Sequence, residues 1–296
     1  MTVSPFVTAP LSIGLQEIVD LALREDIGTG DVTTLATIPA DRQASGTILA
    51  KEPGVISGME VARFVFARVD NAITFEALVE DGDVVARGTD LARISGPARS
   101  VLLAERTALN LMQRLSGVAT ITSRYVAATS GTEANIVDTR KTTPGLRMLE
   151  KRAVRHGGAR NHRFGLADGI LIKDNHLAAI GGGDRITSAI AAARDRAPHT
   201  LRVEIEVDTL DQFDEALLAG ADIILLDNMD TATMQEAVRR RNASDRHPIL
   251  EASGGITLER IPEIAAVGVD LISVGALTHS AKALDISLDL TVHGAR

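Results

Sequence analysis

Apolar and polar positions follow two different patterns along the chain. Near the start, residues 15–25 carry apolar side chains at helical spacing, which predicts an amphipathic helix. The region that follows contains short apolar runs separated by turn residues, a pattern typical of short strands. These runs lie at residues 47–50, 54–56, 74–77 and 84–86. The first part of the chain is therefore expected to combine helices with a small sheet.

A longer helix is expected at residues 100–115, which are apolar around most of the helical circumference. Its polar exceptions, Arg106, Asn110 and Arg114, are spaced four residues apart, so they lie on one stripe. Gly117 follows and is expected to end the helix. The helix therefore has one polar edge on an otherwise apolar surface.

From residue 135 onward, short apolar strands alternate with helical stretches. The starts of the expected strands are 34, 33, 20, 26 and 22 residues apart, which suits strand–helix units and a parallel sheet. This half is therefore expected to form an α/β barrel. The expected strands are residues 136–137, 170–172, 203–207, 223–226, 249–250 and 271–274.

Each of these six strands carries chemically capable residues at its carboxyl end. In an α/β barrel the active site is assembled at this end, and glycine-rich loops after late strands bind phosphate. A single charge at a strand end is more often a cap or a surface residue, but six in succession favour an active site. The residues in question are 139–141, 173–176, Glu204 and Glu206, 227–228, 253–255 and 275–276.

Charge is distributed unevenly along the chain. The net charge of −8 argues against general nucleic-acid binding, yet residues 139–173 hold nine Lys or Arg and only two acids. That window therefore carries +7 and the remainder −15. Phe164 is its single aromatic residue, too few for base stacking. The window favours binding of a small, highly charged anion, although a solvated basic face would explain the charge equally well.

Several classes of protein are excluded by what the sequence lacks. There is no cysteine, so a disulfide framework and a thiol nucleophile are ruled out. The longest apolar run has five residues, far short of a membrane span, and residues 1–14 have neither a basic residue nor the long apolar core of a signal peptide. A cytoplasmic location is therefore expected.

Cations dominate one set of candidate site residues. Arginine suits carboxylate ligands because its planar fork donates two parallel hydrogen bonds. A dense group of cations repels itself unless counter-ions are present, so it implies a ligand with several negative charges, or else pairing with acids of neighbouring loops. The group comprises Arg106, Arg140, Lys141, His162, Arg163 and Lys173.

Two acids form a second set. Glu206 and Asp227 belong to strands expected to be neighbours and should face the same cavity. Paired carboxylates can transfer protons, hold Mg²⁺ or stabilise a developing cation, and the residues alone leave these three roles open. Together with the cations and the glycine loops, they fit a reaction between a phosphorylated sugar and a charged partner.

Nine short segments of the chain form a recognisable set of motifs. They are LREDIGTGDVTT (23–34), ERTALN (105–110), DTRKTTPGLR (138–147), NHR (161–163), LIKDNH (171–176), EIEVD (204–208), LLDN (225–228), SGG (253–255) and SVGA (273–276). In this order, from about residue 15 to the end, the chain resembles quinolinate phosphoribosyltransferases (nicotinate-nucleotide diphosphorylase, carboxylating; a type II phosphoribosyltransferase family), and the block from Thr139 to His176 is the most specific. Two positions depart from the family pattern: Ala159 replaces the third glycine of a triplet, and Arg152 replaces a common tyrosine.

The resemblance implies a reaction and an architecture. Quinolinate and phosphoribosyl pyrophosphate would give nicotinate mononucleotide, pyrophosphate and CO₂ with Mg²⁺ in NAD biosynthesis. The fold would be an N-terminal α/β sandwich joined to an open, incomplete α/β barrel, in a homodimer whose partner supplies Arg106. The implied division is residues 1–116 for the sandwich, 117–280 for the barrel, and 281–296 for a segment returning to the sandwich.

The resemblance also implies roles for individual residues. Lys141, Glu206 and Asp227 would be catalytic, and Mg²⁺ would be held mainly through pyrophosphate and by Glu206 and Asp227. The quinolinate-binding residues would be Arg106, Thr139, Arg140, Lys141, His162, Arg163 and Lys173. Phosphoribosyl pyrophosphate would be bound by Lys141, Lys173, Glu206, Asp227, Ser253, Gly254, Gly255, Val274, Gly275 and Ala276.

Three other interpretations compete with this one. A related phosphoribosyltransferase acting on nicotinate would leave part of the cation group unpaired, at about 1–3 kcal/mol per buried group. A Schiff-base aldolase would use Lys141 or Lys173, whose pKa cationic neighbours would lower. A carrier half-barrel opening at residues 80–89 would need a displayed lysine, and Lys51 is the only lysine of that region.

Overall fold

The computed structural model describes residues 13–293 as two compact units. The first contains residues 13–123, 142–158 and 277–293, and the second contains residues 124–141 and 159–276. The sequence predicts that residues 1–14 are not a signal peptide. Most of this segment, residues 1–12, lies outside the described residues. The sequence-based division after residues 116 and 280 stays a prediction.

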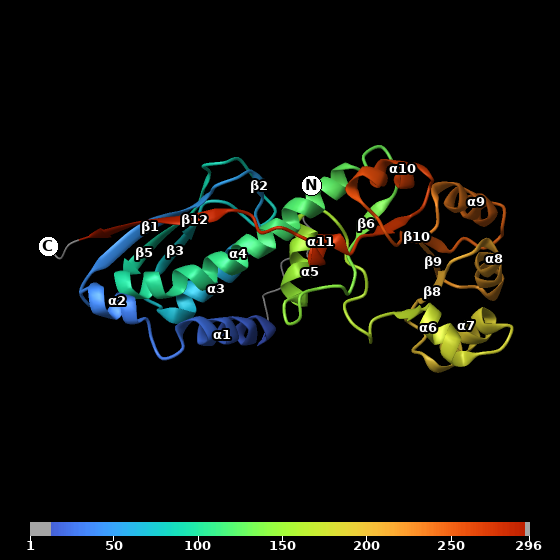
Figure 1. Cartoon of the computed structure of the whole chain (residues 1–296), viewed down its shortest axis with the longest axis horizontal. Coiled ribbons are helices and arrows are strands. Elements are labelled where there is room, and N and C mark those ends of the chain that lie inside the picture. Colours follow the sequence, from blue (N-terminus) through green and yellow to red (C-terminus); the bar gives the residue numbers. More distant parts are fainter. Residues whose placement is uncertain (1–12, 294–296) are drawn as a thin grey trace. The chain divides into compact units, whose positions relative to one another are not determined.

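The first unit is built around a four-stranded antiparallel sheet in the order β12-β1-β5-β3 (Figure 1). Its strands are β1 (Gln43–Ala50), β3 (Thr74–Ala77), β5 (Asp90–Pro97) and β12 (Ile286–His293), and β2 (Gly54–Val55) pairs with β4 (Val84–Val85). The four expected runs lie in β1, β2, β3 and β4, so they are confirmed as strands. The end of the chain pairs along the whole of β1, with Ala50 opposite Ile286.

Helices accompany this sheet in the first unit. Fully buried side chains such as Phe66 of α3 and Met112 of α4 form its core with Ile48 and Leu91 of the sheet. The helix expected at residues 15–25 is confirmed as α1. The helices are α1 (Ile13–Ile27), α2 (Val32–Thr37), α3 (Met59–Val69), α4 (Ala98–Ala127), α5 (Arg147–His156) and α11 (Ala276–His279).

The expected end of the long helix at Gly117 is wrong. Helix α4 has 30 residues and continues through Gly117 to Ala127. A Cβ atom at Gly117 would collide with the carbonyl oxygen of Lys282, which the chain brings against the helix at this point. Gly117 therefore permits a close approach between two segments, which a sequence pattern does not distinguish from a helix end.

The second unit contains a six-stranded parallel sheet in the order β6-β11-β10-β9-β8-β7. The edge strands β6 and β7 do not pair with each other, so the sheet is an open barrel. All six expected strands are confirmed, with small differences at their ends. They are β6 (Asn135–Val137), β7 (Ile170–Ile172), β8 (Val203–Val207), β9 (Ile223–Asp227), β10 (Ile249–Ser253) and β11 (Leu271–Ser273).

Helices cover the outside of this sheet, and Figure 1 shows α7, α8 and α9 beside β8, β9 and β10. Thr209 and Gln212 form a reciprocal capping box at the start of α8, and Asp230 caps α9. No helix within residues 13–293 is long and apolar enough to cross a membrane. The helices are α6 (Asp174–Ile180), α7 (Arg185–Arg196), α8 (Leu210–Ala219), α9 (Thr231–Asn242) and α10 (Ile261–Ala266), with a 3₁₀ turn at Leu258–Arg260.

Candidate active site

The carboxyl ends of the parallel strands bring together the chemically capable residues of the second unit. Lys173 directly follows β7, Glu206 lies in β8, and Asp227 and Ser253 end β9 and β10. Ser253 lies opposite Asp227 in the register of the sheet. The expectation that Glu206 and Asp227 belong to neighbouring strands is therefore confirmed, and these side chains share one edge of the sheet.

Lys173 and Glu206 form an ion pair at this edge. The Nζ atom of Lys173 contacts Oε2 of Glu206, whose side chain is 10% exposed. Lys173 occupies the position before α6, and its backbone N–H donates to Nδ1 of His176. The lysine is therefore held by both its backbone and its charge, next to the carboxylates.

Asp227 lies where negative charge is concentrated. Burial raises the pKa of its carboxyl group, and the nearby Glu206 and Asp208 raise this pKa further. Asn228 opposes the shift by donating from Nδ2 to Oδ2 of Asp227 at 2.6 Å. A carboxylate in these surroundings is stabilised by an approaching cation or by hydroxyl donors.

A tight backbone turn follows β10. Gly254 and Gly255 both have positive φ angles, 86° and 59°. Asn228, itself at φ 53°, donates its backbone N–H to the carbonyl of Ser253, and a Cβ atom at Gly254 would collide with it. The glycines therefore let two loops pack at the strand ends, and such turned backbone can present N–H groups to an anion.

The second glycine segment lies beside β6. The backbone N–H of Val274 donates to the carbonyl of Val137 at 2.9 Å, and α11 begins at Ala276. Gly275 and Ala276 therefore follow β11 at the same end of the sheet as Ser253 and Gly254.

The basic residues after β6 are organised by a buried acid, Asp138. This carboxylate is fully buried and accepts the backbone N–H of His162 at 2.8 Å and Nδ2 of Asn161 at 2.7 Å. Next to it, the Thr139 hydroxyl accepts the backbone N–H of Lys141 at 3.0 Å. The two basic segments predicted from the sequence are therefore held side by side.

Arg163 lies close to other charges. Burial lowers the pKa of its guanidinium, and nearby Arg140 lowers it further, while Glu204 and Asp168 oppose the shift. Its Nη1 donates to the carbonyl of Gly169 at 2.9 Å. An anionic ligand would relieve the repulsion between Arg140 and Arg163.

A hollow of about 280 Å³ opens beside these residues in the second unit. Its lining includes His162, Arg163 and Arg202 together with the acids Glu204 and Glu251. The hollow therefore combines cationic walls with two buried carboxylates.

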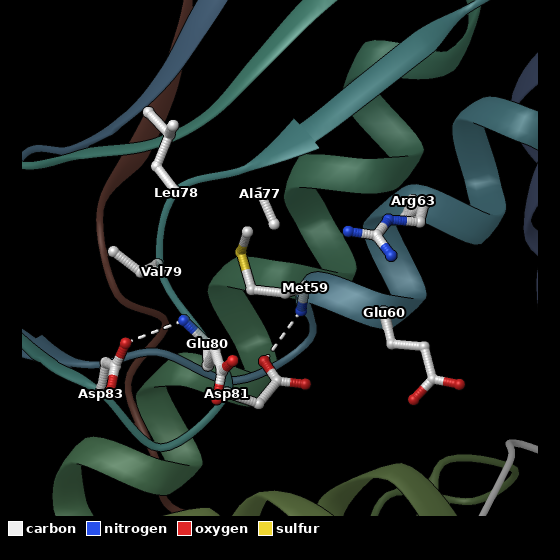
Figure 2. Close-up of a pocket in the computed structure, with 9 residues that line it drawn as sticks. All are labelled: Met59, Glu60, Arg63, Ala77, Leu78, Val79, Glu80, Asp81 and Asp83. Carbon is white, nitrogen blue, oxygen red and sulfur yellow. Dashed lines mark hydrogen bonds between the residues drawn. The ribbon is translucent and has the colours of Figure 1, made fainter.

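The first unit has a hollow of opposite character, drawn in Figure 2. It is lined by Glu60, Glu80, Asp81 and Asp83, with Arg63 as its single cation. Two of the acids hold backbone groups, since Asp81 accepts from Met59 and Asp83 from Glu80 (Figure 2). An anionic ligand would be repelled here, so the basic residues of the second unit are the better anion site.

Arg106 and the two departures from the family pattern lie in different places. Arg106 is on α4 in the first unit, with its side chain 58% exposed and 3.9 Å from Glu105. Arg152 of α5 pairs with Glu60 at 2.6 Å, and Ala159 is buried next to the short bridge between Val137 and Arg160.

Models of two protein domains match almost the whole chain. Residues 31–116 match the N-terminal domain of quinolinate phosphoribosyl transferase, and residues 118–289 match its C-terminal domain. The chain belongs to the quinolinate phosphoribosyltransferase family. The resemblance found in the sequence is thereby confirmed.

Individual relatives agree with this assignment. The chain is 48% identical over 272 residues to the nicotinate-nucleotide pyrophosphorylase [carboxylating] of Mycobacterium leprae, covering 91% of this chain and 94% of the relative. It is 45% identical over 278 residues to the probable enzyme of that name from Bacillus subtilis, covering 94% of each. The crystal structure of NadC from Streptococcus pyogenes superposes with a TM-score of 0.91 at 41% identity, covering 97% of this chain and all of that one. The expected fold and enzyme class are therefore confirmed.

Two buried acids, Asp138 and Glu251, were not among the site residues predicted from the sequence. Asp138 precedes the basic segment, but its burial depends on contacts with residues 161 and 162 that a strand pattern does not reveal. Glu251 was missed because the strand was expected to end at residue 250, whereas β10 extends to Ser253. An acid between apolar neighbours in Ile-Leu-Glu-Ala was the signal available.

Proposed function

We propose that the protein transfers the phosphoribosyl group of phosphoribosyl pyrophosphate to the ring nitrogen of quinolinate, and then releases CO₂ to give nicotinate mononucleotide. The observation that carries this proposal is the meeting of Lys173 with Glu206 and Asp227 at the carboxyl ends of the parallel strands, in a unit that also holds the basic residues after β6. A dicarboxylate and a pyrophosphate together supply the negative charge that these cations need.

The cations would bind the two carboxylates of quinolinate. The crowding of Arg140 and Arg163 supports this role, because bidentate carboxylate contacts would offset their repulsion. Lys141 would lie between quinolinate and pyrophosphate. The proposed quinolinate site comprises Arg106, Thr139, Arg140, Lys141, His162, Arg163 and Lys173.

The acids and the glycine loops would bind the second substrate. Glu206 and Asp227 would accept hydrogen bonds from the ribose hydroxyls and stabilise the cationic character that develops on the ribose as pyrophosphate leaves. Lys141 and Lys173 would neutralise the pyrophosphate. The 5′-phosphate would be held by Ser253, Gly254, Gly255, Val274, Gly275 and Ala276.

The donor set fits Mg²⁺ as a further component. Glu206 and Asp227 supply carboxylate oxygens, the ligands this ion prefers, and the pKa of Asp227 is raised by burial and by the charges of Glu206 and Asp208. A magnesium ion bound mainly to pyrophosphate would neutralise charge on the leaving group. The residues that would contact it are Glu206 and Asp227.

The reaction proceeds in two steps. First the C1–oxygen bond of the ribose breaks, its electron pair leaves with pyrophosphate, and the ring nitrogen of quinolinate forms a bond to C1. The quaternised nitrogen then accepts electron density as the C2–carboxylate bond breaks, CO₂ departs, and C2 takes up a proton. The side chains would contribute orientation and electrostatic stabilisation to both steps.

The ion pair between Lys173 and Glu206 weakens the competing aldolase interpretation. A Schiff-base lysine needs its amine free to attack a carbonyl, whereas the amine of Lys173 is paired with the Glu206 carboxylate. Lys173 is therefore better suited to binding an anion.

The proposal extends to the assembly and the cellular setting. We expect a homodimer in which Arg106 completes the quinolinate site of the partner, and a cytoplasmic enzyme. The exposure of Arg106, with its nearest acid 3.9 Å away, supports a ligand outside its own helix.

A paired substrate assay tests the proposal. The enzyme is given phosphoribosyl pyrophosphate and Mg²⁺ with either quinolinate or nicotinate. We expect kcat/KM to be at least about 100-fold lower for nicotinate, because each unpaired buried donor costs about 1–3 kcal/mol. Comparable values for the two acids would contradict the dicarboxylate assignment.

A further inference from the structure

Three titratable side chains meet inside the parallel sheet, below the edge that holds Glu206 and Asp227. Glu204 of β8 and Glu251 of β10 are 4% and 1% exposed, and they lie on either side of β9. His162 reaches them from the segment that Asp138 holds against β6. All three line the hollow that also contains Arg163.

Hydrogen bonding orients the ring of His162. Its Nδ1 accepts the backbone N–H of Arg163 at 2.7 Å, which places the ring hydrogen on Nε2. Nε2 lies 3.1 Å from Oε2 of Glu204 and 3.6 Å from Oε2 of Glu251. The imidazole therefore favours Glu204, and within residues 13–293 neither carboxylate oxygen of Glu251 has a hydrogen-bond partner.

A buried carboxylate without a partner is strongly disfavoured in its charged form. The charge would be doubly unfavourable here, because Glu204 lies close by and His162, 3.6 Å away, is a proposed contact of the anionic substrate. The Ser273 hydroxyl of β11 opposes the rise of the Glu251 pKa as a potential hydrogen-bond donor, but burial and the charge of Glu204 have the larger effects. The charged or titratable groups around Glu251 are Glu204, His162, Lys173, Arg163, Arg202 and Asp168.

We propose that Glu251 is a positioning residue that keeps a proton beneath His162, so that the enzyme takes up quinolinate together with one proton. This inference rests on the proposed function, since it assumes that His162 contacts the dicarboxylate. When Glu251 is protonated, it carries no negative charge that would compete with the substrate for His162 and Arg163. The site would then accept two carboxylates only while Glu251 is protonated.

The acidity of Glu251 agrees with this assignment. Burial raises its pKa to about 7, Glu204 acts in the same direction, and His162 opposes the shift. Below this pH the free enzyme already holds the proton. Above it the proton is lost, and binding a dianion must draw it back.

A divalent cation is the alternative occupant of the cluster. The donor atoms of His162, Glu204 and Glu251 all lie within 4.8 Å of one another. Lys173, Arg163 and Arg202 would oppose the two positive charges of a divalent cation, whereas a proton adds one positive charge and only neutralises Glu251. The proton is therefore the better fit, and a cation becomes an outcome of the test.

Proton uptake on binding tests the proposal directly. Quinolinate is titrated into the metal-free enzyme at pH 8 in buffers with different ionisation enthalpies. We expect the wild type to take up about 0.9 proton per site and the isosteric variant Glu251→Gln to lack this uptake. Glu204→Gln is the matched control: because Glu204 raises the pKa of Glu251, this variant should keep the uptake and shift its midpoint to lower pH.

Kinetics supply a second readout. The ratio of quinolinate kcat/KM for the wild type to that for Glu251→Gln should fall about tenfold from the low-pH plateau to pH 8. Quinolinate binding without proton uptake in the wild type, uptake retained in Glu251→Gln, or one Mn²⁺ bound in a Glu251-dependent manner would each overturn the inference. A protein that neither binds nor converts quinolinate would instead contradict the proposed function.

Discussion

Burial and the charges of Glu206 and Asp208 disfavour the charged form of Asp227, a residue whose proposed role is to stabilise a cation. We expect Asp227→Asn to lower kcat by about 100-fold or more, because a stabilising charge in a transition state is typically worth that much. The dissociation constant of quinolinate should change by less than about threefold, since its binding would depend on other residues. Steady-state kinetics and calorimetry measure the two quantities.

Asp208→Asn provides the control for that variant. Asp208 is exposed and acts on Asp227 through its charge, so its removal should lower the pKa of Asp227 and leave kcat near the wild-type value. Loss of quinolinate affinity in Asp227→Asn with normal kcat would reverse the proposed roles.

Glu251 should also make the stability of the protein depend on pH. Its pKa is about 7 in the folded protein and about 4.5 when unfolded, so the folded state binds the proton more tightly. The resulting stabilisation is complete below pH 4.5 and is lost as the pH rises through 7. Relative to Glu251→Gln, the free energy of unfolding of the wild type should fall by on the order of 3 kcal/mol between pH 4 and pH 8. Parallel pH dependences in urea unfolding would contradict this expectation.

Individual site residues could be predicted from the sequence where their position follows from the pattern of a strand. Glu206 and Asp227 could be found because each lies near the end of an apolar run. Asp138 and Glu251 could not, because their importance comes from burial and from partners that lie far away in the chain.

Between elements, an ion pair with a fully buried acid joins α4 to α5 in the first unit. Arg114 donates from Nε and Nη2 to Glu150, which is fully buried, and also contacts the carbonyls of Thr278 and Ala281. Glu150 further accepts the backbone N–H and hydroxyl of Thr143. The pair therefore fixes the start of the segment that follows Lys141.

Glu150→Gln should lower the free energy of unfolding by about 3 kcal/mol, because it leaves a largely buried guanidinium without its counter-charge. Chemical denaturation measures this change. Glu60→Gln removes the partner of Arg152 near the surface and should cost less than about 1 kcal/mol. Equal effects of the two substitutions would contradict the importance of burial at Glu150.

Sequence patterns predict which elements form better than they predict where each element ends. The strands of the barrel are found from apolar runs bounded by polar residues, because a parallel sheet is buried on both faces. Helix α4 was expected to end at Gly117, because the close approach of Lys282 is invisible in the sequence.

In the whole molecule, neither compact unit is formed by one continuous stretch of the chain. Residues 142–158 and 277–293 belong with the first unit, although they lie within or after the sequence of the second. The fold class could be predicted from alternating strands and helices. The resemblance implied that the C-terminal segment returns to the sandwich, but the placing of residues 142–158 in the first unit could not be predicted, because it depends on contacts between distant residues such as Glu150 and Arg114.

Mixed dimers test whether Arg106 acts across a subunit interface. The Arg106→Ala and Lys173→Ala homodimers should each be nearly inactive, because each lacks one cation in every site. A mixed dimer would combine the Lys173 of one chain with the Arg106 of the other in one complete site, so about half of the wild-type activity should return. Verified mixed dimers that remain inactive would place Arg106 in the site of its own chain.

We propose that phosphoribosyl transfer and loss of the C2 carboxylate occur on one substrate, quinolinate. The decisive measurement uses quinolinate labelled in that carboxylate, incubated with the enzyme, phosphoribosyl pyrophosphate and Mg²⁺. We predict one labelled CO₂ for every nicotinate mononucleotide formed, and no labelled CO₂ when phosphoribosyl pyrophosphate is omitted. A mononucleotide that keeps the label, or CO₂ released without the sugar substrate, would contradict the account.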